Sequence, residues 1–529
     1  EFWILLIVLL VLAAGIYGKI AKVKPDKIRK SKGMRIFLSL ILIVIGIWAV
    51  GALLSSPIVN AGKYQKLMAV ENGEFSKDIE ELSFDQIPLL DKDSAEILGN
   101  RKMGSMVDMV SQFEVDELYS QINYQDRPVR VSPLKYADLI KWFTNRSEGL
   151  PAYVLVDMVT QEATVTRLTE GMKYSFSEPL NRNILRHLRF QYPTFMFSTP
   201  RFEIDEEGNP WWIAPKVVKT IGLFGGTDID GAVLCNAITG ESQYYAKDEV
   251  PTWVDNVYTP ELIMQQYDYH GTLINGFINS VLGQRDVTIT TQGYNYIAIN
   301  DDVYVYTGVT SANADQSNLG FLLSNQRTKE TKFYDAPGAT EEAAKVSAQG
   351  VVQDLGYIAT FPLLLNIADQ PTYFIPLKDQ ANLVKMYAMV NVAQYQIVAT
   401  GTTVSQCEQE YIQLLSESGV TETEALPQTE ASGPVAEIRS AVLEGNTYYF
   451  VRLEGEEVFY ALSAADNPTA VILNVGDQVT ITHAVSQEEA SILDGYTLTI
   501  QGRAQAQVTL PQEPSAQEIS EESGEAPAA

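Results

Sequence analysis

Few side chains in this sequence have the types and spacing that catalysis requires. His187, His270 and His483 stand in unrelated segments, and none belongs to a His-Glu-x-x-His or other metal-binding pattern. Cys235 stands in an apolar, strand-like run with no histidine beside it, and no Gly-x-Ser-x-Gly motif is present. We therefore predict no catalytic residues and no cofactor, and we expect that the protein is not an enzyme.

The best candidate for a metal site is the stretch GLFGGTDIDG at positions 222–231. Asp228 and Asp230 are weak calcium-ligand candidates, because calcium takes carboxylate oxygens. The stretch lacks a glutamate at the far ligand position, and no Lys-Ser or Lys-Thr pair at a helix start follows to bind phosphate. A tight turn accounts for the glycines better, so we predict no metal site.

A cluster of basic residues is the best candidate for an interaction surface. Arg182, Arg186 and Arg189 lie in RNILRHLRF, and their spacings of four and three residues place them on one face of a helix. One interpretation is that they pair with acids nearby. The other is that they dock on an acidic surface of a neighbouring molecule.

Length and charge bound the organisation of the chain. Its 529 residues exceed what one hydrophobic core organises, so several domains are expected. The formal charge of −28 and the pI near 4.5 exclude nucleic acid as an expected partner, since an acidic surface repels phosphate. Cys235 and Cys407 stand in different settings, and the sequence does not decide whether they pair.

Two uncharged apolar runs, Phe2–Gly18 and Ile36–Leu54, have the length of membrane-spanning helices. A signal peptide or a buried core helix is the alternative interpretation. The loop 19–35 between them carries eight Lys or Arg residues and one Asp, which predicts that it is cytoplasmic. Residues 1–54 are therefore predicted to anchor the chain in a plasma membrane, with its acidic bulk outside.

Four segments share one hairpin pattern. In each, an apolar strand ends at Asp or Asn, Thr or Gln follows three residues later, and Glu or Gln follows two residues after that. Such Asp and Asn side chains accept backbone N–H groups ahead of them and reverse the chain. Amphipathic segments over 260–280, 340–354 and 403–416 follow as expected helices. We predict an α+β body of repeated hairpin-plus-helix units over 151–416, with turns at Asp157, Asn236, Asn325 and Asn391.

The string NAITGE after an apolar strand, with the strand PWWIAPKVV before it, resembles the hairpin signature of PepSY-type domains. Longer phrases, among them IGLFGGTDIDGAVLCNAITGE and QGYNYIAINDDVYVYTG, resemble a family of uncharacterised membrane-tethered extracellular proteins of anaerobic Gram-positive bacteria. The resemblance implies an envelope location and repeated antiparallel units, and it transfers no catalytic residue. The sequence departs from the pattern because only Gly240 keeps the turn glycine, which Gln161, Lys329 and Tyr395 replace.

The remaining segments differ in composition and residue pattern from the repeated body. Residues 55–150 mix helix-start signals with short apolar repeats and are predicted to be a mostly helical stalk or adaptor, with a short strand and then a helix ending at Asn145 in PVRVSPLKYADLIKWF. Residues 417–434 have the composition of a linker. Five strand-like segments over 435–504 predict a small OB-like or SH3-like β-barrel, and 505–529 is an acidic tail.

Together these features favour a non-enzymatic, membrane-anchored extracellular scaffold that self-associates at the surface of a Gram-positive-type bacterium. One alternative is a PepSY-like regulator or recruiter of an envelope peptidase or wall-processing enzyme. Another is a surface protein that binds peptide or glycan. The expected partners are the membrane, further copies of the chain and other envelope proteins, and not nucleic acid.

Overall fold

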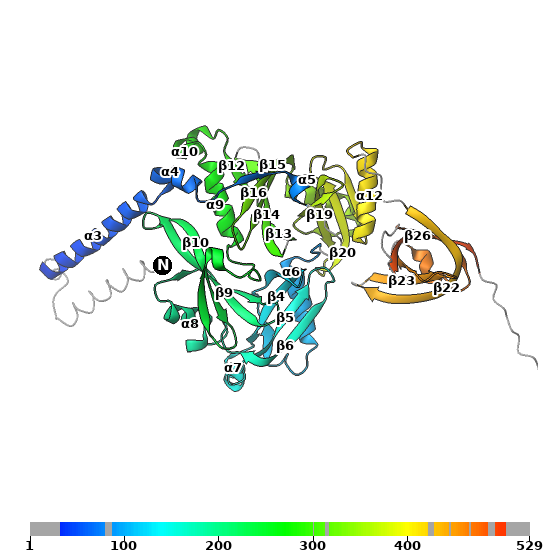
Figure 1. Cartoon of the computed structure of the whole chain (residues 1–529), viewed down its shortest axis with the longest axis horizontal. Helices are drawn as coiled ribbons and strands as arrows, with labels where there is room; N and C mark the ends of the chain where they lie inside the picture. Colours follow the sequence, from blue (N-terminus) through cyan, green and yellow to red (C-terminus); the bar gives the residue numbers. More distant parts are fainter. Residues whose placement is uncertain are drawn as a thin grey trace, which may run out of the picture. The chain divides into compact units, whose positions relative to one another are not determined.

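The computed structural model describes residues 32–503, except 80–86, 300, 313–316, 422–427, 444–445, 465–466 and 485–491. Among the described residues, 42% lie in strands and 27% in helices. The protein is therefore mostly β-sheet, and the predicted α+β class is wrong (Figure 1). The chain divides into two compact units, Glu1–Ala425 and Leu426–Ala529.

The described chain begins with two consecutive helices, α3 (Lys32–Leu54) and α4 (Pro57–Gln65). Within the described residues no single helix is long and apolar enough to cross a membrane, and only α3 from Leu42 together with α4, bent by 42° at their junction, passes that test as a pair. The prediction of a spanning helix over 36–54 is corrected accordingly. The other predicted span, 2–18, lies outside the described residues.

The junction between α3 and α4 is held by contacts to the second sheet of the fold. The Ser55 hydroxyl accepts the backbone N–H groups of Leu223 (3.0 Å) and Phe224 (3.2 Å). The Tyr64 hydroxyl donates to the Ser55 carbonyl at 2.6 Å. Because Pro57 starts the next helix and cannot continue the hydrogen bonding of α3, the chain bends at this junction.

The first sheet takes its strands from 113–136, inside the region 55–150 that was expected to be a helical stalk, and from 150–172, which extends beyond it. Its order is β2-β4-β5-β6, and β3 also pairs with β4. A single short strand was expected at 128–136, followed by a helix that ends at Asn145, and both are present; the sheet around them was not expected, because Pro128 and Pro133 are unusual in a strand that pairs on both sides. The strands are β2 (Phe113–Val115), β3 (Ser120–Tyr124), β4 (Arg127–Tyr136), β5 (Leu150–Asp157) and β6 (Ala163–Met172).

Three further sheets complete the described part of the first unit. The second contains β7 (Met196–Phe197), β8 (Arg201–Ile204), β9 (Pro210–Ile221), β10 (Gly225–Asn236) and β11 (Ser242–Ala246). The third contains β1 (Glu71–Gly73), β12 (Thr288–Thr290), β13 (Asn295–Ile299), β14 (Asp302–Ser311), β15 (Ser317–Asn325) and β16 (Thr331–Ala339). The fourth contains β17 (Ile358–Ala359), β18 (Leu363–Ile367), β19 (Gln370–Lys378), β20 (Val384–Asn391) and β21 (Val398–Gly401).

Helices at the predicted positions begin at threonine caps. The hydroxyls of Thr259, Thr340 and Thr403 each accept the N–H of the residue three positions ahead, at 3.1–3.3 Å. They start α9 (Pro260–Thr272), α11 (Glu341–Val351) and α12 (Val404–Glu417). The other helices and helical turns of this unit are α5 (Phe75–Asp78), α6 (Lys92–Gly104), α7 (Leu139–Asn145), η2 (Leu180–Arg182), α8 (Ile184–Gln191), η3 (Lys247–Glu249), α10 (Gly276–Ile278), η4 (Asn279–Gly283) and η5 (Gln353–Leu355).

The hairpin turns predicted at Asp157, Asn236 and Asn325 are confirmed. Each side chain accepts two backbone N–H groups, from the residues two and three positions ahead, at 2.8–3.0 Å. Gln161 (φ 60°) and Lys329 (φ 66°) adopt the same left-handed conformation as Gly240 (φ 78°), so the missing glycines do not change the turn. The fourth turn differs, because the N–H of Asn391 bonds to the carbonyl of residue 397, six positions on.

The turns recur, but the sheets around them are not copies of one unit. Their strand orders differ, and the third sheet also includes β1, which pairs in parallel with β16 from a segment far away in the chain. Such long-range pairing does not fit a series of self-contained hairpin-plus-helix modules. The predicted PepSY-like repeat is therefore not supported.

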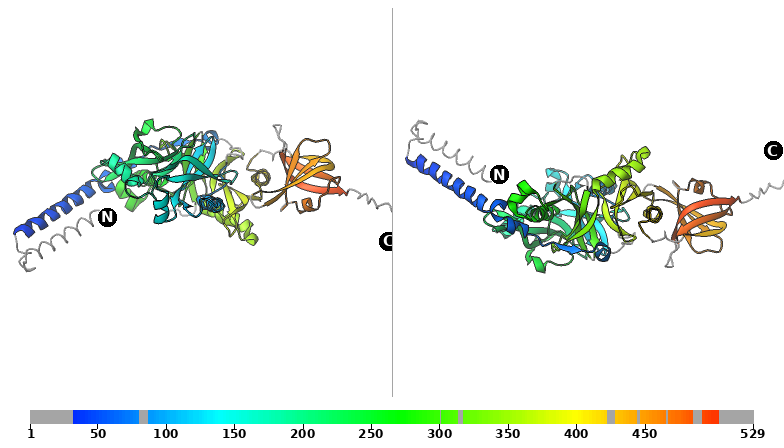
Figure 2. Two further views of the ribbon diagram at one scale, coloured as in Figure 1. Left: turned by 90° about the horizontal axis from the view of Figure 1, so that it is seen from below. Right: turned by 90° about the horizontal axis from the view of Figure 1, so that it is seen from above.

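The second unit contains five strands that close into a barrel in the order β22-β23-β24-β26-β25. Figure 2 shows this unit, in orange and red, from two further sides. Its core includes Val451, Leu462, Val479 and Ile481, all fully buried. The first strand already starts at Gln428, so only part of the predicted linker 417–434 connects the units. The elements are β22 (Gln428–Leu443), β23 (Asn446–Leu453), β24 (Phe459–Ser463), η6 (Pro468–Ile472), β25 (Gln478–Ala484) and β26 (Ile492–Gly502).

Candidate functional site

The three arginines singled out in the sequence lie together on the surface of the first unit. Asn183 caps α8 by accepting the N–H of Arg186, and the helix buries Ile184 and Leu188. This orientation leaves Arg186 and Arg189 exposed on the opposite side. Arg182 lies in the preceding turn, η2, so the predicted shared helical face holds for two of the three residues.

None of these arginines forms an ion pair with a described acid. Arg182 donates to the carbonyl of Arg146 at 2.6 Å, and Arg189 donates to the carbonyl of Phe195 at 2.6 Å. The guanidinium of Arg189 also lies 6.0 Å from the centre of the Phe197 ring. Pairing with local acids, the first interpretation of the cluster, is therefore not observed.

Exposed apolar side chains lie beside Arg182, on the short helix α7. The exposed fractions are 76% for Leu139, 72% for Ile140 and 60% for Phe143, and no residue of α7 is buried. The guanidinium of Arg146, just after the helix, lies 4.5 Å from the centre of the Phe143 ring. Because Arg182 bonds to the carbonyl of Arg146, α7 and η2 form one surface.

Glu178 fixes the position of α7 relative to the turn that leads into α8. This carboxylate is buried and accepts the Tyr136 hydroxyl at 2.7 Å and the indole N–H of Trp142 at 2.8 Å. Tyr136 belongs to β4 and Trp142 to α7, while Glu178 lies two residues before η2. The surface is thus anchored to the first sheet, which keeps its groups in place without a partner.

Leu180 shows local strain on the same surface. Its φ is 55°, in the left-handed region that is unfavourable for a non-glycine residue, yet its side chain is exposed. Neither burial nor a turn glycine explains this conformation. Strain of this kind is concentrated at functional positions. We call this surface the arginine face; it comprises Leu139, Ile140, Phe143, Arg146, Leu180, Arg182, Arg186, Arg189 and Phe190.

The calcium candidates do not form a site. Both carboxylate oxygens of Asp228 accept from the ammonium of Lys329, at 2.8 and 2.9 Å. Asp230 instead accepts from Lys216 at 2.6 Å. The described residues contain no group of three or more His, Cys, Asp or Glu side chains placed to hold a metal ion. Each aspartate is therefore neutralised by its own lysine.

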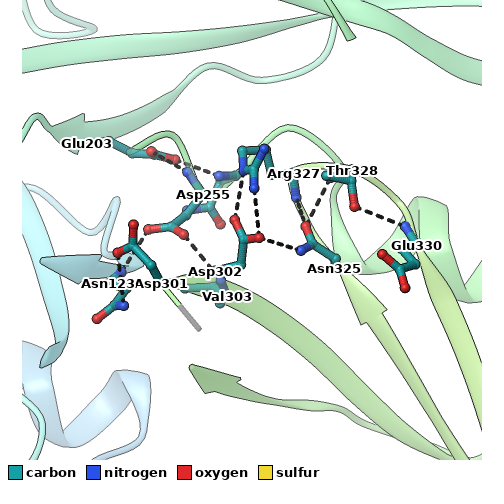
Figure 3. A network of polar contacts seen from close by, with 11 residues as sticks. Asn123, Glu203, Asp255, Asp301, Asp302, Val303, Asn325, Arg327, Thr328 and Glu330 are labelled. Carbon is teal, nitrogen blue, oxygen red and sulfur yellow. Dashed lines mark hydrogen bonds and ion pairs between the residues drawn. The ribbon is translucent and has the colours of Figure 1, made fainter. Parts of the chain in front are cut away.

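A pair of buried acids, which the sequence analysis missed, joins three of the sheets (Figure 3). Glu203 of β8 accepts the backbone N–H groups of Asp255 (3.0 Å) and Asn256 (2.9 Å). Asp255 accepts the N–H of Asn123 in β3 (2.7 Å) and of Val303 in β14 (3.2 Å). We call Glu203 and Asp255 the acidic joint. Both acids are buried beneath the surface, so they hold backbone rather than meet a substrate.

Burial governs the electrostatics of the acidic joint. It raises the pKa of Glu203 to about 7, and burial followed by repulsion from Glu203 raises the pKa of Asp255 well above its ordinary value. Beside them, Asp302 binds Arg327 through two contacts of 2.7 Å and so has a charge partner of its own. The sequence signal was slight: Glu203 stands between Phe202 and Ile204, and Asp255 directly follows Trp253 and Val254.

Both cysteines are buried and free, so they do not pair. Burial raises the pKa of Cys235 to about 12, which makes it a poor nucleophile. Of the three histidines, His187 contacts the carbonyl of Gly240 at 2.8 Å and His270 contacts that of Gln65 at 3.1 Å. These side chains take part in packing, and no two of them come together in a constellation.

Comparisons with known proteins do not assign this chain to a family. No family model matches the chain, and no curated protein matches it. Among solved structures, it is similar at 12% identity to a protein of unknown function from Dyadobacter fermentans DSM 18053, over 74% of this chain and 93% of that one. The TM-score of 0.17 is too low to support an argument about fold or function. The resemblance to PepSY-type domains thus gains no support from known proteins.

Proposed function

We propose that this protein is a non-enzymatic interaction protein that associates with further copies of itself through the arginine face. The observation that carries the proposal is a cluster of arginines without acid partners among the described residues, beside exposed apolar side chains, in a chain of net charge −28. Aromatic residues and arginine are enriched at protein interfaces and dominate their binding energy. Another copy of so acidic a chain offers complementary charge.

The rest of the first unit supports a binding role. The buried acid Glu203 and the buried thiol of Cys235 have raised pKa values, and Lys216 and Lys329 neutralise the aspartates of β10. The acidic joint ties three sheets together, which gives the arginine face a rigid base. Rigid elements with a preset surface bind at a lower entropic cost.

The test is the mass of the full chain, purified in a mild detergent, measured by sedimentation over a range of protein and salt concentrations. The parent should associate, and association should weaken as salt rises, because exposed charges are screened. The variant Arg182→Glu, Arg186→Glu, Arg189→Glu should sediment as a monomer under conditions in which the parent associates.

A control must carry the same change in net charge. Arg101, Arg127 and Arg285 are exposed and lie outside the arginine face, so their triple change to Glu is matched. This control should associate as the parent does. A parent that remains monomeric at every concentration contradicts the proposal, and so does a face variant that associates like the control.

A further inference from the structure

We infer that the arginine face of one copy binds the acidic segment 505–529 of a second copy. This inference rests on the proposed function and names the partner segment. The segment contains five glutamates and no lysine, arginine, histidine or aspartate. Its glutamates are Glu513, Glu518, Glu521, Glu522 and Glu525.

The acids of this segment have no base within reach along the chain, unlike some acids of the folded surface. On the barrel, Glu437 is held by Arg439 at 2.8 Å and by Arg452 at 3.0 Å. In the first unit, Lys329 and Lys216 neutralise the aspartates of β10. Within 505–529 no such local pairing can occur, so its five charges need cations from elsewhere.

The arginine face offers those cations in the matching form. Arg146, Arg182, Arg186 and Arg189 form no ion pair with a described acid, and a guanidinium binds a carboxylate through two parallel hydrogen bonds. Recognition of acidic peptide motifs by arginine clusters is an established mode of binding. Four arginines on one surface suit a segment with several glutamates better than a single acid.

The apolar composition of the two partners also agrees. The face exposes Leu139, Ile140 and Phe143, which a purely electrostatic partner would leave in water. The segment places Ile519 directly after Glu518 and two residues before Glu521, and Leu510 lies three residues before Glu513. Carboxylates can therefore pair with the arginines while the aliphatic side chains cover α7.

The inference fixes the kind of assembly. Each copy has one face and one segment, and these are different surfaces, so the contact is heterologous and joins copies head to tail. Such contacts close into rings or continue as open chains. Two copies that exchange segments reciprocally form the smallest closed assembly, and copies that do not close in this way associate beyond a dimer as the protein concentration rises.

A labelled peptide of residues 505–529 tests the contact by fluorescence anisotropy. The receptor is the full chain in which the five glutamates of the segment are changed to Gln, so that its own segment does not compete. We expect saturable binding that weakens with salt. The changes Arg182→Glu, Arg186→Glu and Arg189→Glu in that receptor should weaken binding at least about tenfold, since each exposed ion pair is worth up to about 1 kcal/mol and 1.4 kcal/mol is tenfold.

Three controls separate the outcomes. A peptide with all five glutamates changed to Gln should bind at least about tenfold more weakly. The Arg101→Glu, Arg127→Glu, Arg285→Glu receptor should bind the parent peptide normally. In sedimentation, the chain with the five Gln substitutions should be a monomer under conditions in which the parent associates.

If the chain with five Gln substitutions associates like the parent and the peptide does not bind, the inference is wrong while the proposed function stands. If the parent is monomeric at every concentration, the proposed function fails. Peptide that binds the Gln receptor but is excluded from a monomeric parent would mean that the segment occupies its own chain's face. That result also overturns association between copies.

Discussion

Replacing Glu203 with Gln should remove much of the pH dependence of unfolding that arises in the acidic joint. Burial raises the pKa of Glu203 from its ordinary 4.5 to about 7. Between these values the folded protein retains a proton that the unfolded chain releases, so the free energy of unfolding falls as pH rises through this window. A glutamine side chain does not titrate, so the substitution cancels this loss.

The size of the effect follows from the pKa of the two states. One pKa unit corresponds to about 1.4 kcal/mol, so Glu203 costs the native state roughly 2 to 3 kcal/mol between pH 5 and pH 8. The substitution also removes the repulsion that helps to raise the pKa of Asp255, which acts in the same direction. The NH₂ group of glutamine cannot accept one of the two backbone N–H groups that Glu203 accepts. This loss lowers the free energy of unfolding by about 1 to 3 kcal/mol at every pH.

The assay is urea unfolding followed by tryptophan fluorescence at pH 5 and pH 8. All six tryptophans belong to the first unit, so the signal reports the unit that contains the joint and not the barrel. The quantity to compare is the free energy of unfolding of the variant minus that of the parent. This difference should rise by about 2 to 3 kcal/mol from pH 5 to pH 8, because only the parent loses stability through the titration of Glu203. The cost of the amide is the same at both pH values and does not affect the rise.

Glu241→Gln is the matched control, since this carboxylate is exposed in the turn after β10. Its difference from the parent should show no comparable rise. If the difference for Glu203→Gln also stays constant between pH 5 and pH 8, then burial does not hold a proton on this carboxylate. The electrostatic explanation of the acidic joint would then be refuted.

Two further predictions follow from single residues. Ellman's reagent should modify neither Cys235 nor Cys407 before the protein unfolds, because both thiols are free and buried, and native labelling of either would contradict the structure. Gln161→Gly should raise the free energy of unfolding by up to about 1 kcal/mol in urea titrations, because glycine adopts the left-handed turn conformation without strain, whereas a loss of stability would show that the side chain's bond to Tyr387 outweighs that strain.

Local structure could be predicted because its causes are local. The turns at Asp157, Asn236 and Asn325 depend on a side chain that accepts N–H groups two and three residues ahead. The start of α12 likewise depends on Thr403 and a residue three positions away. Such contacts can be recognised in a single sequence, whatever the rest of the fold does.

The assembly of the sheets could not be predicted in the same way. The acidic joint links Asn123, Glu203, Asp255 and Val303, which are 48 to 132 residues apart in the chain where they bond. The local sequence of each segment does not indicate which distant segment it will bond to. The prediction of a spanning helix at 36–54 rested on composition alone; α3 (Lys32–Leu54) covers this run, but no single described helix is long and apolar enough to cross a membrane.

The arginine face shows where the two kinds of inference meet. The spacing of Arg182, Arg186 and Arg189 was visible in the sequence, but it could not show that they pair with no acid among the described residues. Elsewhere in the described chain, arginines with acids nearby do pair, as Arg327 does with Asp302 and Arg452 with Glu437. No acid in the described part of the chain neutralises the cluster, which is why we look for its countercharge in the segment 505–529 of a second copy.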